Sequence, residues 1–120
     1  MSSFPWSLTT RRINDVTIVH LTGRFTLGGS VSEFEAAVTG ALAQGVRSFL
    51  VNLGEVTYID SAGIGKLTFA MKSAIAAGGS LKLVNVNQRV AGLLKLTGVY
   101  PVFEIFRDES VAVASFSAVA

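Results

Sequence analysis

The chain has 120 residues, of which 50% are hydrophobic and 15% are charged. This length suits a single domain with one core, which we expect to span residues 1–120, and this composition excludes a disordered protein. The formal net charge is only +2, the ten lysines and arginines are scattered, and there is no cysteine, so we expect no direct DNA binding, no disulfide and no thiolate metal site.

The first predicted element is a β-hairpin. Residues 8–13 and 16–22 are rich in strand-forming residues, and they flank Asn14-Asp15, a typical two-residue turn. Residues 23–29 are then expected to form a loop. The hairpin would give the sheet an antiparallel strand at its edge.

A helix and a buried strand are predicted next. Ser30 and Ser32 are candidate caps for the helix, because each is followed three residues later by a glutamate, the spacing of a capping box. Gly45 is a natural stop for this helix. Residues 48–53 are short and apolar, which indicates a strand buried on both faces.

A second helix is predicted after Ser61 and ends at Gly78. Its apolar residues recur at helical spacing, at Ile64, Leu67, Met71 and Ile75. Residues 81–86 then predict another strand.

The last part of the chain predicts a helix, a strand and an ambiguous tail. Asn87 is a candidate cap for the helix, and residues 102–106 predict the strand. In the tail 110–116 the valines alternate as in a strand, whereas the preceding Asp108-Glu109 favours the start of a helix. The alternation of strands and helices predicts an α/β fold with right-handed crossovers and a mixed, mostly parallel sheet.

The stretch VTYIDSAGIGKLTFA, residues 56–70, carries the most suggestive chemistry, but the templates for catalytic and phosphate-binding loops fail on it. A dinucleotide-binding loop would need glycine where Thr68 stands, and a P-loop would need glycine where Asp60 stands. A hydrolase serine would need glycine where Ile59 stands, two residues before Ser61.

Other catalytic and metal-binding groups are also missing. The single histidine, His20, lies in the middle of a predicted strand, where a packed or partly exposed strand residue is expected. With one histidine, no cysteine and no tight carboxylate cluster, the sequence predicts no metal site, no cofactor and no enzyme activity.

Ser61 is expected at the start of a helix, at the carboxyl edge of the sheet, where ligands and partners of α/β sheets bind. The free N–H groups and the positive end of the helix dipole at such a position tolerate a phosphate. The simpler alternative, which the spacing alone favours, is that Asp60 or Ser61 only caps the helix.

No segment predicts membrane insertion or secretion. Charges interrupt the long apolar runs, and the uncharged stretch 110–120 is too short to span a bilayer. The start, MSSFPWSLTTRR, lacks a basic segment followed by an apolar block, so no signal peptide is expected. The lack of cysteine is consistent with a cytoplasmic protein.

Taken with blocks elsewhere in the chain, the motif around Ser61 resembles the STAS family, the anti-sigma factor antagonists of bacteria. The resemblance rests on YIDSAGIGKL at 58–67, which matches the D-S-x-G motif of the family, and on four further blocks in the same order: LTGRF, FLVNLGEV, GGSLKLVNV and VAGLLKLTGVYPVFEIFRDESVAVASF. It implies a sheet with an antiparallel first strand, helices packed mainly on one face, and a helical tail.

The resemblance also implies a function. Family members of this size are anti-sigma factor antagonists: they bind a partner that is both a serine kinase and an anti-sigma factor, and thereby release the sigma factor. The kinase phosphorylates the serine of D-S-x-G, here Ser61, which switches the protein off, and a serine phosphatase resets it. The implied partner-binding residues are Arg24, Thr26, Asp60, Ser61, Ala62, Gly63 and Ile64.

One block departs from the family. Many members continue LTG with Glu-Leu-Asp, whereas this chain has Arg24 and Thr26 at the two acidic positions. Arg24 is a candidate partner for a phosphate. The departure keeps an alternative open, in which the chain is a constitutive STAS subunit of a larger assembly, such as a stressosome-like complex or a lipid-transport ATPase. The other alternative is a small nucleotide-binding protein.

Overall fold

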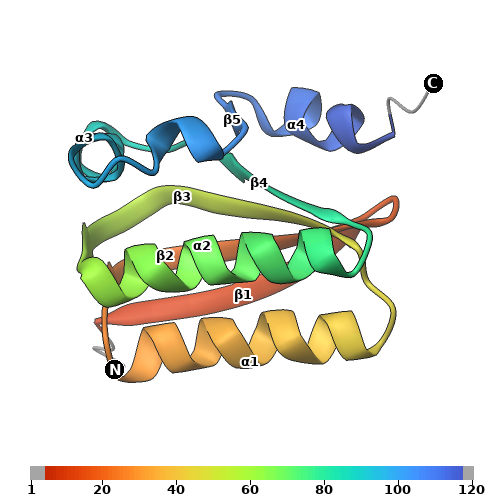
Figure 1. Ribbon diagram of the computed structural model, residues 1–120, viewed down its shortest axis with the longest axis horizontal. Coiled ribbons are helices and arrows are strands. Elements are labelled where there is room, and N and C mark those ends of the chain that lie inside the picture. Colours follow the sequence, from red (N-terminus) through yellow and green to blue (C-terminus); the bar gives the residue numbers. More distant parts are fainter. Residues whose placement is uncertain (1–4, 118–120) are drawn as a thin grey trace.

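The computed structural model describes residues 5–117. Five strands form one sheet in the order β1-β2-β3-β4-β5, with β1 antiparallel to β2 and the other neighbours parallel (Figure 1). This confirms the predicted fold class. The elements are β1 (Trp6–Ile13), β2 (Val16–Phe25), α1 (Gly29–Ala43), β3 (Ser48–Ile59), α2 (Ser61–Ala76), β4 (Ser80–Val84), α3 (Gln88–Leu96), the 3-10 turn η1 (Tyr100–Val102), β5 (Ile105–Phe106) and α4 (Glu109–Phe116).

The opening hairpin is confirmed, with Ile13 paired to Val16 across the turn. Asn14 adopts the left-handed conformation, with a φ of 55°, which asparagine tolerates better than most residues. The loop predicted over 23–29 is wrong in its first half, because β2 continues to Phe25.

The extra length of β2 and β3 has a tertiary cause. Phe25 pairs with Ile59 in the parallel ladder, so β3 also runs well beyond the predicted residues 48–53. The ring of Phe25 is buried edge-on against Phe34 of α1, with the centroids 5.3 Å apart. Burial of this aromatic pair stabilises the strand ends that carry the site described below.

The later strands are shorter than predicted. β4 ends at Val84, before Asn85, which has a φ of 58°. The strand predicted over 102–106 is wrong at its start, because Tyr100–Val102 form η1 and only Ile105–Phe106 pair with β4. Pro101 stands near the start of η1, where its missing N–H removes no hydrogen bond.

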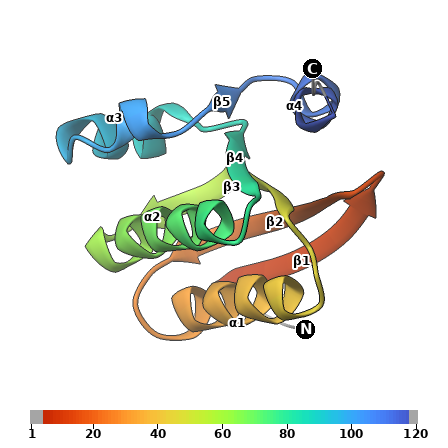
Figure 2. The same cartoon turned by 45° about the vertical axis from the view of Figure 1, so that its right-hand side comes forward.

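Helices α1 and α2 lie side by side on one face of the sheet (Figures 1 and 2). Their buried residues, with those of α3, form the main core over β2, β3 and β4. The predicted stripe of α2 is confirmed at Ile64, Leu67 and Met71 and wrong at Ile75, which is 58% exposed. Gly63, Ala70 and Ala74 complete the buried face instead.

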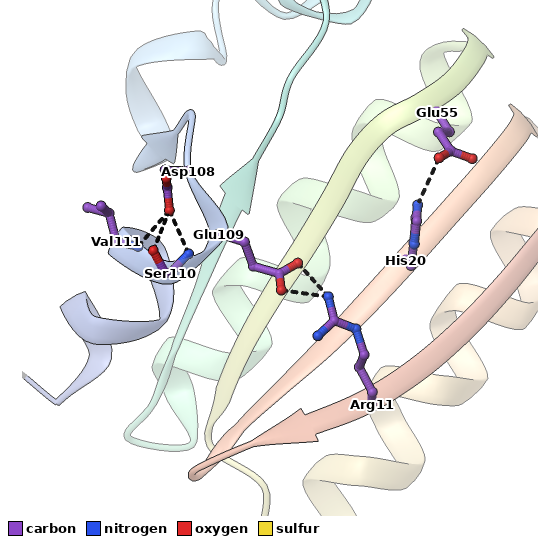
Figure 3. Close-up of polar contacts among 7 residues, drawn as sticks. All are labelled: Arg11, His20, Glu55, Asp108, Glu109, Ser110 and Val111. Carbon is purple, nitrogen blue, oxygen red and sulfur yellow. Dashed lines mark hydrogen bonds and ion pairs between the residues drawn. The ribbon is translucent and has the colours of Figure 1, made fainter.

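The ambiguous tail forms α4, on the opposite face of the sheet, where Ala112 and Val113 pack over Ile18 and Leu50. Its start is capped by Asp108 (Figure 3), as expected for a helix. The helix implied by the family resemblance is therefore confirmed, and periodicity alone was insufficient because the helix is short and only weakly amphipathic.

The predicted capping box of α1 is wrong. The residue before the helix is Gly28, and it makes no side-chain cap. Ser30 lies inside the first turn and is buried, and its Oγ accepts a hydrogen bond from the backbone N–H of Thr26 at 2.9 Å. The predicted cap Asn87 of α3 is confirmed, since its Oδ1 accepts from the N–H of Val90.

Candidate functional site

Ser61 is the first residue of α2 and follows β3 after a single residue. Its side chain is exposed at the carboxyl edge of the parallel strands. This confirms the predicted place of the hydroxyl, at a helix start on the edge where α/β proteins usually bind their ligands.

The cap of α2 is Asp60. Its Oδ1 accepts a hydrogen bond from the backbone N–H of Gly63 at 2.9 Å, and its Oδ2 accepts one from the N–H of Leu27 at 3.0 Å. Of the two cap candidates, the structure therefore selects Asp60. The structure shows no hydrogen bond from Ser61 Oγ to any other residue within 5–117.

The carboxylate of Asp60 is held in its charged form. Partial burial raises its pKa, but the backbone N–H groups of Leu27 and Gly63 oppose this effect, and the net result is a pKa below the ordinary value. The same two bonds tie the start of α2 to the loop between β2 and α1. Asp60 thus supports the position of Ser61 from both sides.

Gly63 is needed for close packing inside the domain. A Cβ at this position would lie 2.5 Å from the carbonyl oxygen of Phe25, far inside van der Waals contact. Gly63 and Ile64 are both buried, whereas Ser61 is exposed and Ala62 is half-buried. Ile64 belongs to the main core, as its place in the predicted apolar stripe of this helix requires.

Arg24 and Thr26 lie on the strand and loop next to this helix start. The guanidinium carbon of Arg24 lies 5.0 Å from the centroid of the Tyr58 ring, a cation–π contact across β2 and β3. Thr26 uses its backbone to start α1, because its carbonyl accepts from the N–H of Val31 and its N–H donates to Ser30. Thr26 precedes Leu27, whose backbone N–H donates to Oδ2 of Asp60, so Thr26 lies close to the cap of α2.

Sequence reasoning missed a groove that begins at Ser61 and runs along α2. It measures about 460 Å³ and is open to solvent on one side. Phe69 was the signal that could have indicated it, since this aromatic residue lies off the buried stripe of α2 and is 55% exposed. The residues that line the groove are Ser61, Ile64, Gly65, Thr68, Phe69, Lys72, Thr97 and Val99.

His20 lies away from this helix start, on the face of the sheet that also carries α4. It is a partly exposed strand residue, as predicted, and its Nε2 lies 4.0 Å from Oε2 of Glu55 (Figure 3). Within the described residues, no cluster of three or more metal-ligating side chains is found. Helices long and apolar enough to cross a membrane are likewise absent from residues 5–117.

The fold and this helix start define a STAS domain. The family model of the STAS domain matches residues 7–112, so the chain belongs to that family. Over 70 residues, or 58% of the chain, it is 31% identical to the anti-sigma-B factor antagonist of Staphylococcus aureus, and over 64 residues, or 53% of the chain, it is 34% identical to that of Bacillus subtilis. The matches span 65% and 59% of the lengths of these two relatives.

Solved structures share the fold at lower identity. The unphosphorylated form of the anti-sigma factor antagonist SpoIIAA superposes with a TM-score of 0.81 at 20% identity, covering 95% of this chain and 99% of the other. The phosphorylated form of the Bacillus protein SpoIIAA gives 0.74 at 19% identity, with 91% and 98% covered. The named relatives are thus anti-sigma factor antagonists.

Proposed function

We propose that this protein is an anti-sigma factor antagonist that binds an anti-sigma factor with serine kinase activity, and that phosphorylation of Ser61 ends this binding. In this proposal the chain is the substrate of the kinase and catalyses nothing itself. A serine phosphatase returns it to the binding form. We also place the chain in the cytoplasm, with which its lack of cysteine is consistent.

One observation carries the proposal: the side chain of Asp60 caps α2, and that of Ser61 does not. Because Asp60 caps α2, the hydroxyl of Ser61 is free to enter the active site of another protein. Its exposure at the very start of the helix gives a kinase access without unfolding the domain. The motif is the D-S-x-G of the family, and its serine is the residue that carries the phosphate in the family pattern.

The position also suits an electrostatic switch. A phosphate on Ser61 adds about 1.5 to 2 negative charges and three acceptor oxygens next to the carboxylate of Asp60. The free protein leaves this charge in water and near the positive end of α2. A partner closed over Ser61 would have to bury the charge, and a penalty of about 2.7 kcal/mol weakens binding about a hundredfold.

A second candidate function keeps the STAS fold without the switch: a constitutive subunit of a larger assembly. The environment of Arg24 favours it, because this base stands where many members have an acid and its guanidinium lies over Tyr58. The nucleotide-binding alternative is weaker, since the N–H of Gly63, which a phosphate loop would use, is already bonded to Asp60.

The experiment is co-expression with the serine kinases of the source organism, followed by intact-mass measurement. We expect one added phosphate on the wild type and none on Ser61→Ala. Ser32→Ala is the matched control, because Ser32 is also exposed in the first turn of a helix, and it should be phosphorylated like the wild type. Equal kinase binding by the wild type and Ser61→Asp would contradict the switch and favour the constitutive subunit.

A further inference from the structure

We infer that the groove along α2 is the docking site for an amphipathic α-helix of the kinase partner, with an apolar central face and an acidic residue at one end. The inference rests on the proposed function, since it identifies the surface that the same partner covers together with Ser61. It assigns a role to residues outside the D-S-x-G motif.

The groove follows one face of a helix. Ser61, Gly65, Thr68 and Lys72 recur at the spacing of three or four residues that aligns side chains along α2. From the first to the last of them the helix rises about 16 Å, which is about three turns. The opposite wall comes from Thr97 and Val99, which follow the end of α3.

The middle of the groove offers no free side-chain hydrogen-bond donor. The hydroxyl of Thr68 donates to the carbonyl of Ile64 at 3.0 Å, and that of Thr97 donates to the carbonyl of Leu93 at 2.9 Å. Beyond the first turn of α2, the backbone N–H groups are used within the helix itself. An extended peptide would leave its own C=O groups without donors here, which favours an occupant that satisfies its backbone internally, as a helix does.

Phe69 lines the groove, and contacts with its neighbours orient its ring. Its ring lies 5.0 Å from the ammonium of Lys66, which in turn pairs with Glu35 at 3.1 Å. These contacts hold the ring while it remains 55% exposed. An exposed, oriented aromatic residue beside an open apolar groove is typical of the residues that contribute most to a binding energy. Gly65 deepens the groove, since a Cβ there would meet no atom within 4 Å.

The charge of Lys72, at the end of the groove away from Ser61, predicts which end of the docked helix is acidic. Lys72 is the only charged side chain among the lining residues, it is exposed, and no ion pair joins it to another residue of the described part of the chain. An acidic residue on the partner helix would complement it. Because the groove begins at Ser61, the docked helix also covers the hydroxyl, so a phosphate there excludes it.

The test compares binding of the purified serine kinase/anti-sigma factors of the source organism to matched variants by titration calorimetry. Phe69→Ala should weaken binding about tenfold or more, and Gly65→Met should do so by filling the groove. Ile75→Ala is the matched control, because Ile75 is an equally exposed apolar residue of α2 outside the groove, and it should bind like the wild type.

Charge reversal provides a second readout. Lys72→Glu should weaken binding about three- to tenfold at low salt, and the difference should shrink at high salt. Arg12→Glu, a reversal on the hairpin and outside the groove, should have no effect.

The outcomes separate this inference from the proposed function. Suppose that the wild type binds a kinase and is phosphorylated on Ser61 while the groove variants bind equally well. That result would contradict the groove as the docking site and leave the proposed function intact. A wild-type dimer that Phe69→Ala dissociates would assign the groove to a second copy and overturn the inference. If no kinase binds the wild type, both proposals fail.

Discussion

Oδ2 of Asp60 accepts a hydrogen bond from the backbone N–H of Leu27 at 3.0 Å, across 33 residues of sequence. The bond joins the start of α2 to the loop between β2 and α1. Together with the cap on Gly63, it makes one carboxylate the support of both segments around Ser61.

Removing this carboxylate should destabilise the domain. For Asp60→Ala we expect a loss of about 1–2 kcal/mol in the free energy of unfolding, because the cap of α2 and the bond to the loop disappear together. Urea denaturation measures the change. Asp15→Ala is the control, since Asp15 is almost fully exposed in the hairpin turn, and it should change stability by less than about 0.5 kcal/mol. Equal effects of the two variants would contradict the role of Asp60.

The same carboxylate should make stability depend on pH at the acid end. The pKa of Asp60 is lower in the folded protein than its ordinary value of 3.8, so the unfolded chain binds the proton more readily. Its stabilising contribution is therefore complete well above pH 3.8 and is lost as the pH falls below that value. The difference in unfolding free energy between wild type and Asp60→Asn should be constant at neutral pH and shrink below about pH 4.

That comparison isolates one group, because the other carboxylates titrate in both proteins. Urea denaturation in a series of acidic buffers measures the difference. A difference that stayed constant down to pH 2 would contradict the assignment.

Gly63 should not tolerate even a methyl group. Alanine is ordinarily favoured over glycine in a helix by about 1 kcal/mol. At this position its Cβ would lie 2.5 Å from the carbonyl oxygen of Phe25, and backbone must move to relieve the clash. We expect Gly63→Ala to lower stability by about 1–3 kcal/mol. Gly40→Ala is the matched control in α1, where an added Cβ meets nothing within 4 Å, and it should raise stability by about 0.5–1 kcal/mol.

The ion pair between Arg11 and Glu109 should contribute modestly to the docking of α4 (Figure 3). Nη2 of Arg11 lies 2.6 Å from both carboxylate oxygens of Glu109, but the arginine side chain is 51% exposed. A double-mutant cycle with alanine at both positions should give a coupling energy of about 0.5–1 kcal/mol, smaller at high salt. Additive single-variant effects at low salt would show that the pair is energetically silent.

Local signals in the sequence were sufficient for most elements. Asn14-Asp15 predicted the hairpin turn, and Asp60 and Asn87 predicted helix starts, because a cap acts on N–H groups only two or three residues away. The alternation of these elements was enough for the α/β fold class and the mostly parallel sheet, since short right-handed crossovers leave few topologies. The place of Ser61 followed from the same local pattern.

Features that depend on contacts with residues distant in the sequence could not be predicted from local patterns. Ser30 has the spacing of a cap but is buried against Thr26, and Ile75 has the spacing of a core residue but is exposed. β2 and β3 are longer than their composition indicated, because each strand end is stabilised by pairing with the other. Burial of a side chain and the length of a strand depend on which segment packs against them, and sequence periodicity does not indicate that segment.

By itself, the sequence determined the α/β alternation, the helix start at Ser61 and the family motif around it, because these depend on residues close together in the chain. Only the tertiary structure decided that Asp60 rather than Ser61 is the cap, that Gly63 faces Phe25, and that a groove forms between α2 and Val99. Each of these needs two segments brought to within a few ångströms by packing of the core. A contact between distant segments is a property of the folded chain, and no local pattern encodes its distance.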